Sequence, residues 1–289
     1  MPLPNGRSLD FSGPALVMAI VNCNGDSFYP VSRALAAEAV EKALTAAEAG
    51  AAIIDFGGES TRPGASYIDT DEEMRRIIPV IKAFREKSDR LNSRTAVSVD
   101  TRKAAVAKAA LEAGADIIND ISALEDDPDM GPLCAEAGAA VILMHKKGRA
   151  EEKWKSPGYV DVTAEVGRYL AAAALRALGA GIGRNRIIID PGIGFGKTTG
   201  ENLEILAALP ELAEIAGKDY PLLIGLSRKT FIGELTGRDS VPRDPIERLP
   251  GTLGANAAAL LGGADIIRVH DPAEHLDLVK VLYEIKRRA

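Results

Sequence analysis

Cysteines, long apolar runs and excess basic charge are all scarce in this 289-residue sequence. The two cysteines, Cys23 and Cys134, lie far apart and give neither a disulfide framework nor the spacing of a zinc site. No apolar run approaches the roughly 20 residues that a membrane-spanning helix needs. The first eleven residues also lack the apolar segment of a signal peptide. We therefore expect a reduced, cytoplasmic protein with no membrane partner.

The balance of residue types is typical of a soluble globular protein. Hydrophobic residues make up 46% of the chain and charged residues 26%, and the chain is long enough to bury a large core. The formal net charge is −6. Because surfaces that bind nucleic acid are usually basic, we expect no nucleic acid partner.

Four stretches of the sequence share one pattern. They are AGAAIIDFGGES (49–60), AGADIINDIS (113–122), AGAAVILMHKKG (137–148) and GGADIIRVHD (262–271). In each, a helix-like segment ends at a glycine, a short apolar run follows, and a polar cluster comes next. Glycine commonly caps the C-terminal end of a helix. A run that is apolar at every position indicates a strand buried on both faces of a parallel sheet.

The same pattern, extended along the chain, predicts a barrel. Strand-like runs occur at 15–21, 52–55, 96–99, 116–118, 140–143, 186–189, 221–225 and 265–268, with helical patterns between them. Eight such units without a break in composition favour an α/β fold, the (β/α)₈ TIM barrel, over a doubly wound open sheet. We expect one domain over residues 1–289, with its core at about 15–285. The irregular pieces 57–69, 145–160 and 237–248 are interpreted as insertions in βα-loops.

Polar side chains follow nearly every predicted strand. In a barrel of this kind the active site lies at the carboxyl ends of the strands, so these side chains are expected at one mouth. They are Asn22, Asp55, Glu59, Asp100, Asn119, Asp120, His145, Asp190, Ser227, Arg228, Lys229, Arg268 and His270.

Some of these groups suit a flat heterocycle and others suit an anion. Asp100, Asn119, Asp190 and Lys229 mix hydrogen-bond donors with acceptors, and a carboxylate can accept two parallel N–H bonds from a guanidine-like ring edge. The loops after strands seven and eight are the usual phosphate site of this architecture, where Arg268 and His270 are placed. Asn22 offers an oxygen that Mg²⁺ accepts as a ligand.

Three other features are interpreted as structural. GIGFGKT (192–198) is similar to a phosphate-binding P-loop, but three residues separate Gly192 from Gly196 where that motif needs four. His275 is expected on the surface of the last helix. Cys23 has no evident base beside it and is interpreted as an ordinary small residue below the mouth.

Five long motifs resemble those of the dihydropteroate synthase family of pterin-binding barrels. They are GGESTRPGA (57–65), SVDTRKAAVAKAALEAGADIINDISAL (98–124), DPGIGFGKTTGENLEIL (190–206), GLSRKTFIGELTG (225–237) and RVHD (268–271). The resemblance covers about residues 15–285. It implies that 6-hydroxymethyl-7,8-dihydropterin diphosphate is joined to 4-aminobenzoate, giving 7,8-dihydropteroate and diphosphate. It also implies a requirement for Mg²⁺ and a homodimer.

The resemblance assigns roles by position. Pterin diphosphate would be bound by Thr61, Asp100, Asn119, Asp190, Lys229, Arg268, Val269 and His270. 4-Aminobenzoate would be bound by Phe28, Pro63, Phe195 and Thr230, and Thr230 is expected to begin a helix whose N–H groups face the carboxylate. Catalytic roles would fall to Asp26, Arg62, Lys229, Arg268 and His270, and Mg²⁺ to Asn22.

One motif departs from the family pattern. NCNGDSFYP (22–30) matches the first loop, usually Asn-x-Thr-Pro-Asp-Ser-Phe, but carries Asn24-Gly25 in place of Thr-Pro. We expect a working synthase with a looser loop. A non-catalytic pterin-binding homologue and a corrinoid-linked pterin methyltransferase are the alternatives. The second would not need STRPG, SRKTF and RVHD, all of which are present.

Overall fold

Each apolar run predicted from the sequence forms a parallel strand. The computed structural model describes residues 1–23, 29–60, 67–90, 94–148 and 155–288. Its strands are β1 (Leu16–Asn22), β2 (Ile53–Gly57), β3 (Ala96–Asp100), β4 (Ile117–Asp120), β5 (Ala140–Met144), β6 (Ile187–Asp190), β7 (Leu223–Ile224) and β8 (Ile266–Val269). The expected strands therefore all exist, and most of their ends differ from the prediction by one or two residues.

The strands form a closed barrel. Their order is β6-β5-β4-β3-β2-β1-β8-β7, so each strand lies beside its neighbour in sequence apart from the β1–β8 and β6–β7 junctions. β1 pairs with β8 directly. A parallel bridge between Ile189 and Leu222, with the Ile189 N–H donating to Pro221 at 3.0 Å, joins β6 to the segment before β7. The predicted (β/α)₈ barrel is confirmed.

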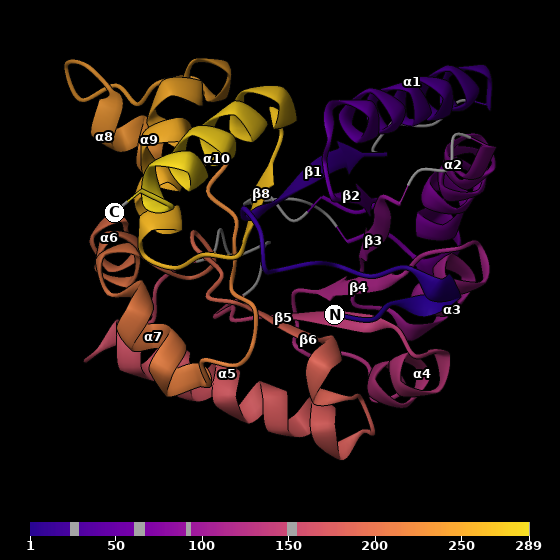
Figure 1. Ribbon diagram of the computed structural model, residues 1–289, viewed down its shortest axis with the longest axis horizontal. Helices are drawn as coiled ribbons and strands as arrows, with labels where there is room; N and C mark the ends of the chain where they lie inside the picture. Colours follow the sequence, from indigo (N-terminus) through magenta and orange to yellow (C-terminus); the bar gives the residue numbers. More distant parts are fainter. Residues whose placement is uncertain (24–28, 61–66, 91–93, 149–154, 289) are drawn as a thin grey trace.

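Helices cover the outside of the barrel on all sides (Figure 1). They are α1 (Tyr29–Ala49), α2 (Thr70–Arg90), α3 (Ala104–Glu112), α4 (Met130–Ala137), α5 (Val162–Gly179), α6 (Thr199–Ala207), α7 (Leu209–Ala216), α8 (Thr230–Thr236), α9 (Leu249–Leu261) and α10 (Pro272–Lys286). Two helices follow β6 and two follow β7. Residues 237–248 therefore connect α8 to α9 and do not join a strand to a helix, which corrects that part of the loop prediction.

Alternation along the strands decides which side chains enter the barrel. Met18, Ile53, Ile117 and Ile266 belong to an interior cluster, together with Leu3 from the N-terminal segment. That segment crosses one end of the barrel, where the label N stands in Figure 1. Because side chains on a strand alternate between faces, residues two positions further along each strand also point inward, nearer the other end. The apolar plug therefore closes one end and leaves the mouth to polar residues.

The environment of His275 differs from the prediction. His275 lies on α10 as expected, but its side chain is fully buried, so the predicted surface position is wrong. Its Nδ1 lies 2.6 Å from the Asp271 carbonyl oxygen one turn earlier, which satisfies one of the two ring nitrogens.

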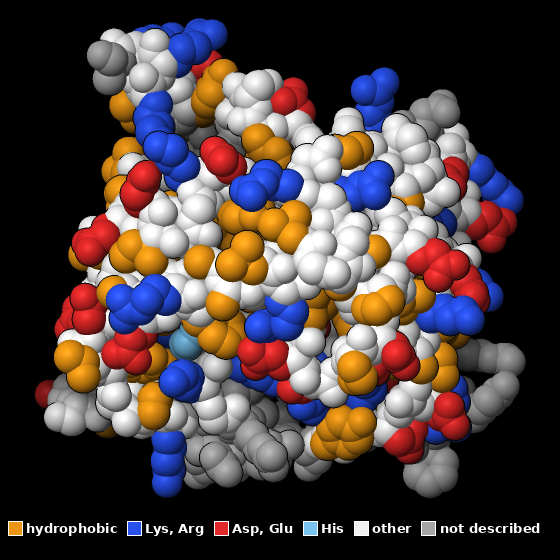
Figure 2. Space-filling model, turned by 90° about the horizontal axis from the view of Figure 1, so that it is seen from below, with side chains coloured by type: hydrophobic (Ala, Val, Ile, Leu, Met, Phe, Trp, Pro, Cys, Tyr) orange, Lys and Arg blue, Asp and Glu red, His pale blue; other side chains and the backbone are white. Residues whose placement is uncertain are grey.

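The described surface carries charged side chains of both signs (Figure 2). Basic and acidic side chains are interspersed over the face drawn in Figure 2. None of the helices in the described part of the chain combines the length and hydropathy of a membrane span.

Candidate active site

Side chains that point into the barrel from different strands bring an arginine and two carboxylates together at the mouth. Arg268 of β8 donates from Nε to Asp55 Oδ2 at 2.7 Å and from Nη2 to Asp100 Oδ2 at 2.9 Å. Asn119 donates from Nδ2 to the same Asp55 oxygen at 3.3 Å. Four strands, β2, β3, β4 and β8, thus contribute to one hydrogen-bonded group. Asp55, Asp100 and Asn119 are buried, whereas the Arg268 side chain keeps 22% of its surface exposed toward solvent.

Burial and charge set the protonation of this group. Burial raises the pKa of Asp100 to about 7, with Arg268 opposing the rise and Asp55 adding to it. Burial alone would lower the pKa of Arg268, but Asp55 and Asp100 together raise it above its ordinary value. The arginine is therefore a permanent positive charge, and Asp100 is the carboxyl whose charge can change near neutral pH.

Asp190 and Lys229 stand close to each other on the other side of the mouth. Asp190, the last residue of β6, is buried and accepts a hydrogen bond from the Gly192 N–H at 2.7 Å. Burial raises the pKa of Asp190. Lys229 is half-buried just before α8, and its Nζ lies 4.0 Å from the centre of the Phe195 ring. Burial lowers the pKa of Lys229 to about 8, with Asp190 opposing that change.

The end of β8 and the loop after β7 fix each other. Ser227 Oγ lies 2.9 Å from His270 Nδ1 and accepts from the His270 backbone N–H at 3.1 Å. Arg228 donates to both carboxylate oxygens of Asp271, at 3.1 and 2.5 Å. Arg228 also has a left-handed φ of 57°, an unfavourable conformation for a residue with a side chain. These bonds hold His270 beside Arg268 at the predicted anion site.

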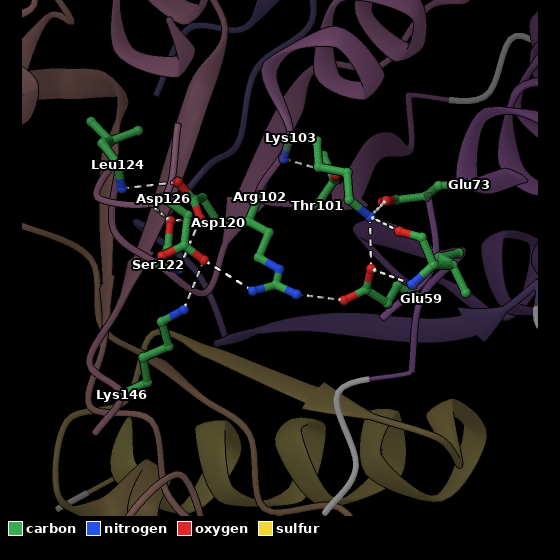
Figure 3. Close-up of polar contacts among 11 residues, drawn as sticks. Glu59, Glu73, Thr101, Arg102, Lys103, Asp120, Ser122, Leu124, Asp126 and Lys146 are labelled. Atoms are coloured by element: carbon green, nitrogen blue, oxygen red, sulfur yellow. Dashed lines mark hydrogen bonds and ion pairs between the residues drawn. The ribbon is translucent and has the colours of Figure 1, made fainter. Parts of the chain in front are cut away.

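A rim of ion pairs ties together the loops after β2 and β3 (Figure 3). Lys103 Nζ lies 2.7 Å from Glu59, 2.5 Å from Glu73 of α2 and 2.9 Å from the Ile68 carbonyl oxygen. Lys103 and Glu73 are both buried. Since Glu59 and Ile68 belong to the two ends of the β2–α2 connection, Lys103 fixes both ends of that connection.

The rim continues to the loops after β4 and β5. Arg102 reaches Glu59 at 3.0 Å and Asp126 at 3.1 Å, and Lys146 reaches the same Asp126 oxygen at 3.0 Å. Figure 3 shows Arg102 between the two carboxylates. These pairs are partly exposed, so each contributes little to stability by itself, and their effect is to align neighbouring loops.

Two strand-end residues expected at the mouth face elsewhere. Asp120 points away from the interior, since Asn119 points into it, and its carboxylate accepts from the Ser122 and Leu124 backbone N–H groups at 2.8 Å. His145 is buried, with Nδ1 2.9 Å from Lys197 Nζ. Burial first, and then the nearby lysine charges, lower the pKa of His145 to about 2. Both residues support loops and do not take part in the pocket.

The other predicted site residues divide into those the structure describes and those it does not. Asn22 ends β1 with an exposed side chain, Val269 ends β8, and Thr230 begins α8 as expected. The role of the α8 N–H groups stays a prediction. Outside the described residues lie Asn24, Gly25, Asp26, Phe28, Thr61, Arg62 and Pro63.

The residues present fit a magnesium ion that takes few ligands from protein. Within the described ranges, no group of three or more His, Cys, Asp or Glu side chains is placed to hold a metal. Asn22 supplies one exposed oxygen donor at the end of β1. Mg²⁺ usually keeps several waters and binds substrate phosphates, so a single protein ligand is compatible with it.

Two structural predictions about nearby residues are also confirmed. Cys23 is half-buried against the core, and burial raises its pKa to about 12, so it is not an activated thiol. In the 192–198 turn, Lys197 is buried with its Nζ on protein acceptors, which is not the arrangement of a P-loop lysine.

Sequence reasoning assigned no role to Asp55, although it noticed the residue. Asp55 comes two positions after Ile53, which points into the interior, as Asp190 does after Ile188. Period-two alternation could therefore have placed Asp55 beside Asp100 and Arg268.

Comparison with known proteins identifies the class of protein to which this barrel belongs. The family model for pterin binding enzymes matches residues 18–270, which is most of the barrel. The chain therefore belongs to the class of pterin-binding enzymes.

Individual relatives identify the family within this class. Dihydropteroate synthase of Synechocystis sp. is 40% identical over 282 residues, covering 97% of this chain and 93% of the relative. The Mycobacterium leprae dihydropteroate synthase is 43% identical, with 93% of each chain covered. A solved Xanthomonas albilineans dihydropteroate synthase with 4-aminobenzoic acid is 41% identical with a TM-score of 0.86, covering 99% of this chain and 98% of that one. This chain belongs to the dihydropteroate synthase family.

Proposed function

We propose that the protein condenses 6-hydroxymethyl-7,8-dihydropterin diphosphate with 4-aminobenzoate, releasing 7,8-dihydropteroate and diphosphate. The observation that carries the proposal is the meeting of buried acceptors with Arg268 at one mouth, bonded at 2.7 and 2.9 Å to Asp55 and Asp100. Solved Xanthomonas albilineans relatives contain 4-aminobenzoic acid and 7,8-dihydropteroate, which supports both a substrate and a product of this class.

The pterin occupies the buried end of the mouth. The second oxygen of Asp190 and the Asp100 carboxylate accept from the N–H edge of the ring, and Asn119 and Lys229 add donors. A carboxylate facing two ring N–H groups makes a charge-assisted pair that fixes the plane of the ring. Thr61 is assigned to the same substrate through the family resemblance.

The diphosphate leaves toward Arg268 and His270. The C–O bond breaks ahead of attack, both bonding electrons go to the diphosphate oxygen, and the pterin ring delocalises the resulting methylene cation. Arg268 and His270, with the Val269 N–H between them, stabilise the negative charge that develops on the departing diphosphate. A Mg²⁺ ion held at Asn22 would add positive charge beside the diphosphate. The resemblance adds Arg62 to this set and gives Asp26 the role of steadying the cation.

4-Aminobenzoate enters beside Phe195 and Thr230, with Phe28 and Pro63 as the remaining walls implied by the resemblance. Its nitrogen forms the new C–N bond and then gives a proton to solvent. An aryl amine is a weak base, so this step requires no strong general base. The Phe195 ring stacked on Lys229 places the aminobenzoate wall next to the pterin pocket.

The family resemblance also supports broader properties. We expect a cytoplasmic homodimer in which residues 1–289 form one pterin-binding domain.

One coupled assay separates this activity from the alternatives. Purified protein is given the pterin diphosphate and Mg²⁺, with and without 4-aminobenzoate, and diphosphate release is followed. A synthase releases diphosphate only when 4-aminobenzoate is present. A non-catalytic homologue binds the pterin and releases none. A pterin methyltransferase releases none but transfers a methyl group to a corrinoid, and either of these last two results would overturn the proposal.

A further inference from the structure

Lys197 is a buried lysine that the proposed reaction does not use. Its side chain is nearly inaccessible, and its Nζ lies 2.9 Å from His145 Nδ1, 2.9 Å from the Gly192 carbonyl oxygen and 3.2 Å from the Phe195 carbonyl oxygen. The two carbonyl oxygens accept hydrogen bonds from Nζ, and His145 Nδ1 accepts a third in the tautomer that carries its proton on Nε2. Burial lowers the pKa of Lys197 to about 7 and the charge of Asp190 opposes that change, so this carboxylate and the hydrogen-bond acceptors together offset the cost of burying the amine.

The three acceptors belong to two segments. Gly192 and Phe195 are in the turn that follows β6, whereas His145 follows β5. The segments are packed tightly, since a Cβ atom at Gly192 would lie 1.9 Å from the His145 carbonyl oxygen. A Cβ at Gly196 would lie 2.3 Å from the Lys147 carbonyl oxygen. Glycines with left-handed φ angles allow this approach, and Lys197 bonds the two segments once they have met.

The same turn carries a wall of the proposed 4-aminobenzoate site. The Phe195 N–H donates to Gly192 at 3.1 Å, and the Gly194 N–H donates to Asn202 Oδ1 at 2.8 Å. With its carbonyl oxygen bonded to Lys197, the Phe195 backbone is held on both sides. Its ring then lies 4.0 Å from Lys229 Nζ. A connected path therefore runs from Lys197 through the turn to Phe195 and Lys229.

We propose that Lys197 is a positioning residue for the 4-aminobenzoate half of the reaction, because it fixes the 192–195 turn that sets the Phe195 ring against Lys229. The inference rests on the proposed function and deepens it. Asp190 and Asn119, the main pterin acceptor and donor, are held at the ends of β6 and β4 by the strands themselves. The turn meets this pair through the Gly192 N–H, which donates to Asp190 Oδ1 and leaves the second Asp190 oxygen for the ring. Loss of Lys197 should therefore harm one substrate much more than the other.

The test replaces Lys197 with Met, which keeps an unbranched side chain, shorter by the terminal nitrogen, and removes the donors. Lys108→Met on the exposed face of α3 is the matched control. Three unmatched acceptors should loosen the turn, so we expect the KM for 4-aminobenzoate to rise about tenfold in Lys197→Met, with the pterin Kd from calorimetry changed less than about twofold. Lys108→Met should match the wild type in both values.

A double-mutant cycle distinguishes positioning from general damage. If Lys197 acts through Phe195, then Phe195→Leu should raise the same KM, and adding Lys197→Met to it should produce much less than the product of the two effects. Multiplicative effects, or equal losses for pterin and 4-aminobenzoate, would overturn the inference. If Lys197→Met does not fold, Lys197→Leu, which also removes the donors and has a smaller apolar side chain, replaces it under the same criteria. Diphosphate release by the wild-type protein is measured before any variant is tested. If the wild type releases none, the proposed function itself is overturned.

Discussion

Arg268 and Asp55 meet across the barrel mouth, from two strands that flank β1, with Nε 2.7 Å from Oδ2. Asp55 is fully buried, and its second oxygen, Oδ1, has no hydrogen-bond partner in the described part of the chain. A buried carboxylate is costly unless it is paired, so Arg268 compensates the burial of Asp55, and Asp55 in turn orients the guanidinium group of Arg268.

Replacing Asp55 with Asn should therefore weaken both the fold and the anion site. The substitution leaves Arg268 with Asp100 as its remaining carboxylate partner. Breaking a fully buried pair costs about 3–5 kcal/mol, and because Arg268 is partly exposed we expect about 2 kcal/mol from the free energy of unfolding. Urea denaturation measures this, and an unchanged midpoint would show that the pair does not stabilise the barrel.

Asp190 and Asp120 make a matched pair for testing the pterin pocket. Asp120 is the last residue of β4 and Asp190 is the last residue of β6. Asp190 points into the mouth, whereas the Asp120 carboxylate accepts hydrogen bonds from the backbone of its own loop. Asp190→Asn replaces an acceptor by a donor, which costs about 1–3 kcal/mol, so pterin affinity should fall about tenfold or more. Asp120→Asn should leave pterin affinity unchanged while lowering the melting temperature. If calorimetry shows that Asp120→Asn loses more pterin affinity than Asp190→Asn, the pterin site is wrongly assigned.

Pterin binding should depend on pH through Asp100. Burial raises the pKa of this carboxyl to about 7 in the free protein. Below that pH it is protonated, and one of its oxygens becomes a donor facing the donor edge of the ring. Binding then requires loss of one proton, so affinity should rise about tenfold per pH unit up to about 7 and level off above it. Asp100→Asn should abolish this dependence. A wild-type affinity that is constant from pH 5 to 8 would contradict the assignment.

Alternation explains how much of the molecule could be predicted from sequence. Runs that are apolar at every position revealed the buried parallel strands, and their polar ends located the mouth. Asp100, Asn119 and Arg268 were found because each is a polar residue at a strand end, and all of them point inward.

The failures arise from contacts between distant segments. His145 and Asp120 are also polar residues at strand ends, but each stands one position past an inward residue and so faces outward. The burial of His275 depends on neighbouring elements that helix periodicity does not identify. Lys197 was noticed only as part of a rejected motif, because its acceptors on the β5 and β6 loops are brought together by the fold.

Asn24 and Gly25 lie outside the described residues, and the prediction for them comes from the sequence alone. Proline restricts the backbone of an unbound chain more than glycine does, a difference of about 0.4–1 kcal/mol where the bound conformation is one that proline can adopt. We expect the double change Asn24→Thr with Gly25→Pro to lower the KM for 4-aminobenzoate about two- to fivefold at saturating pterin substrate. Pterin affinity should stay the same. A raised KM or lost turnover would mean that this loop orders in a shape of its own.

The central claim is that one mouth joins the pterin to 4-aminobenzoate and expels diphosphate. Measuring both products in the same reaction tests it most directly. With Mg²⁺, the pterin diphosphate and 4-aminobenzoate, the protein should form 7,8-dihydropteroate and diphosphate in equal amounts, and neither product should appear when 4-aminobenzoate is omitted. Diphosphate release that does not depend on 4-aminobenzoate, or pterin binding with no product at all, would contradict the account.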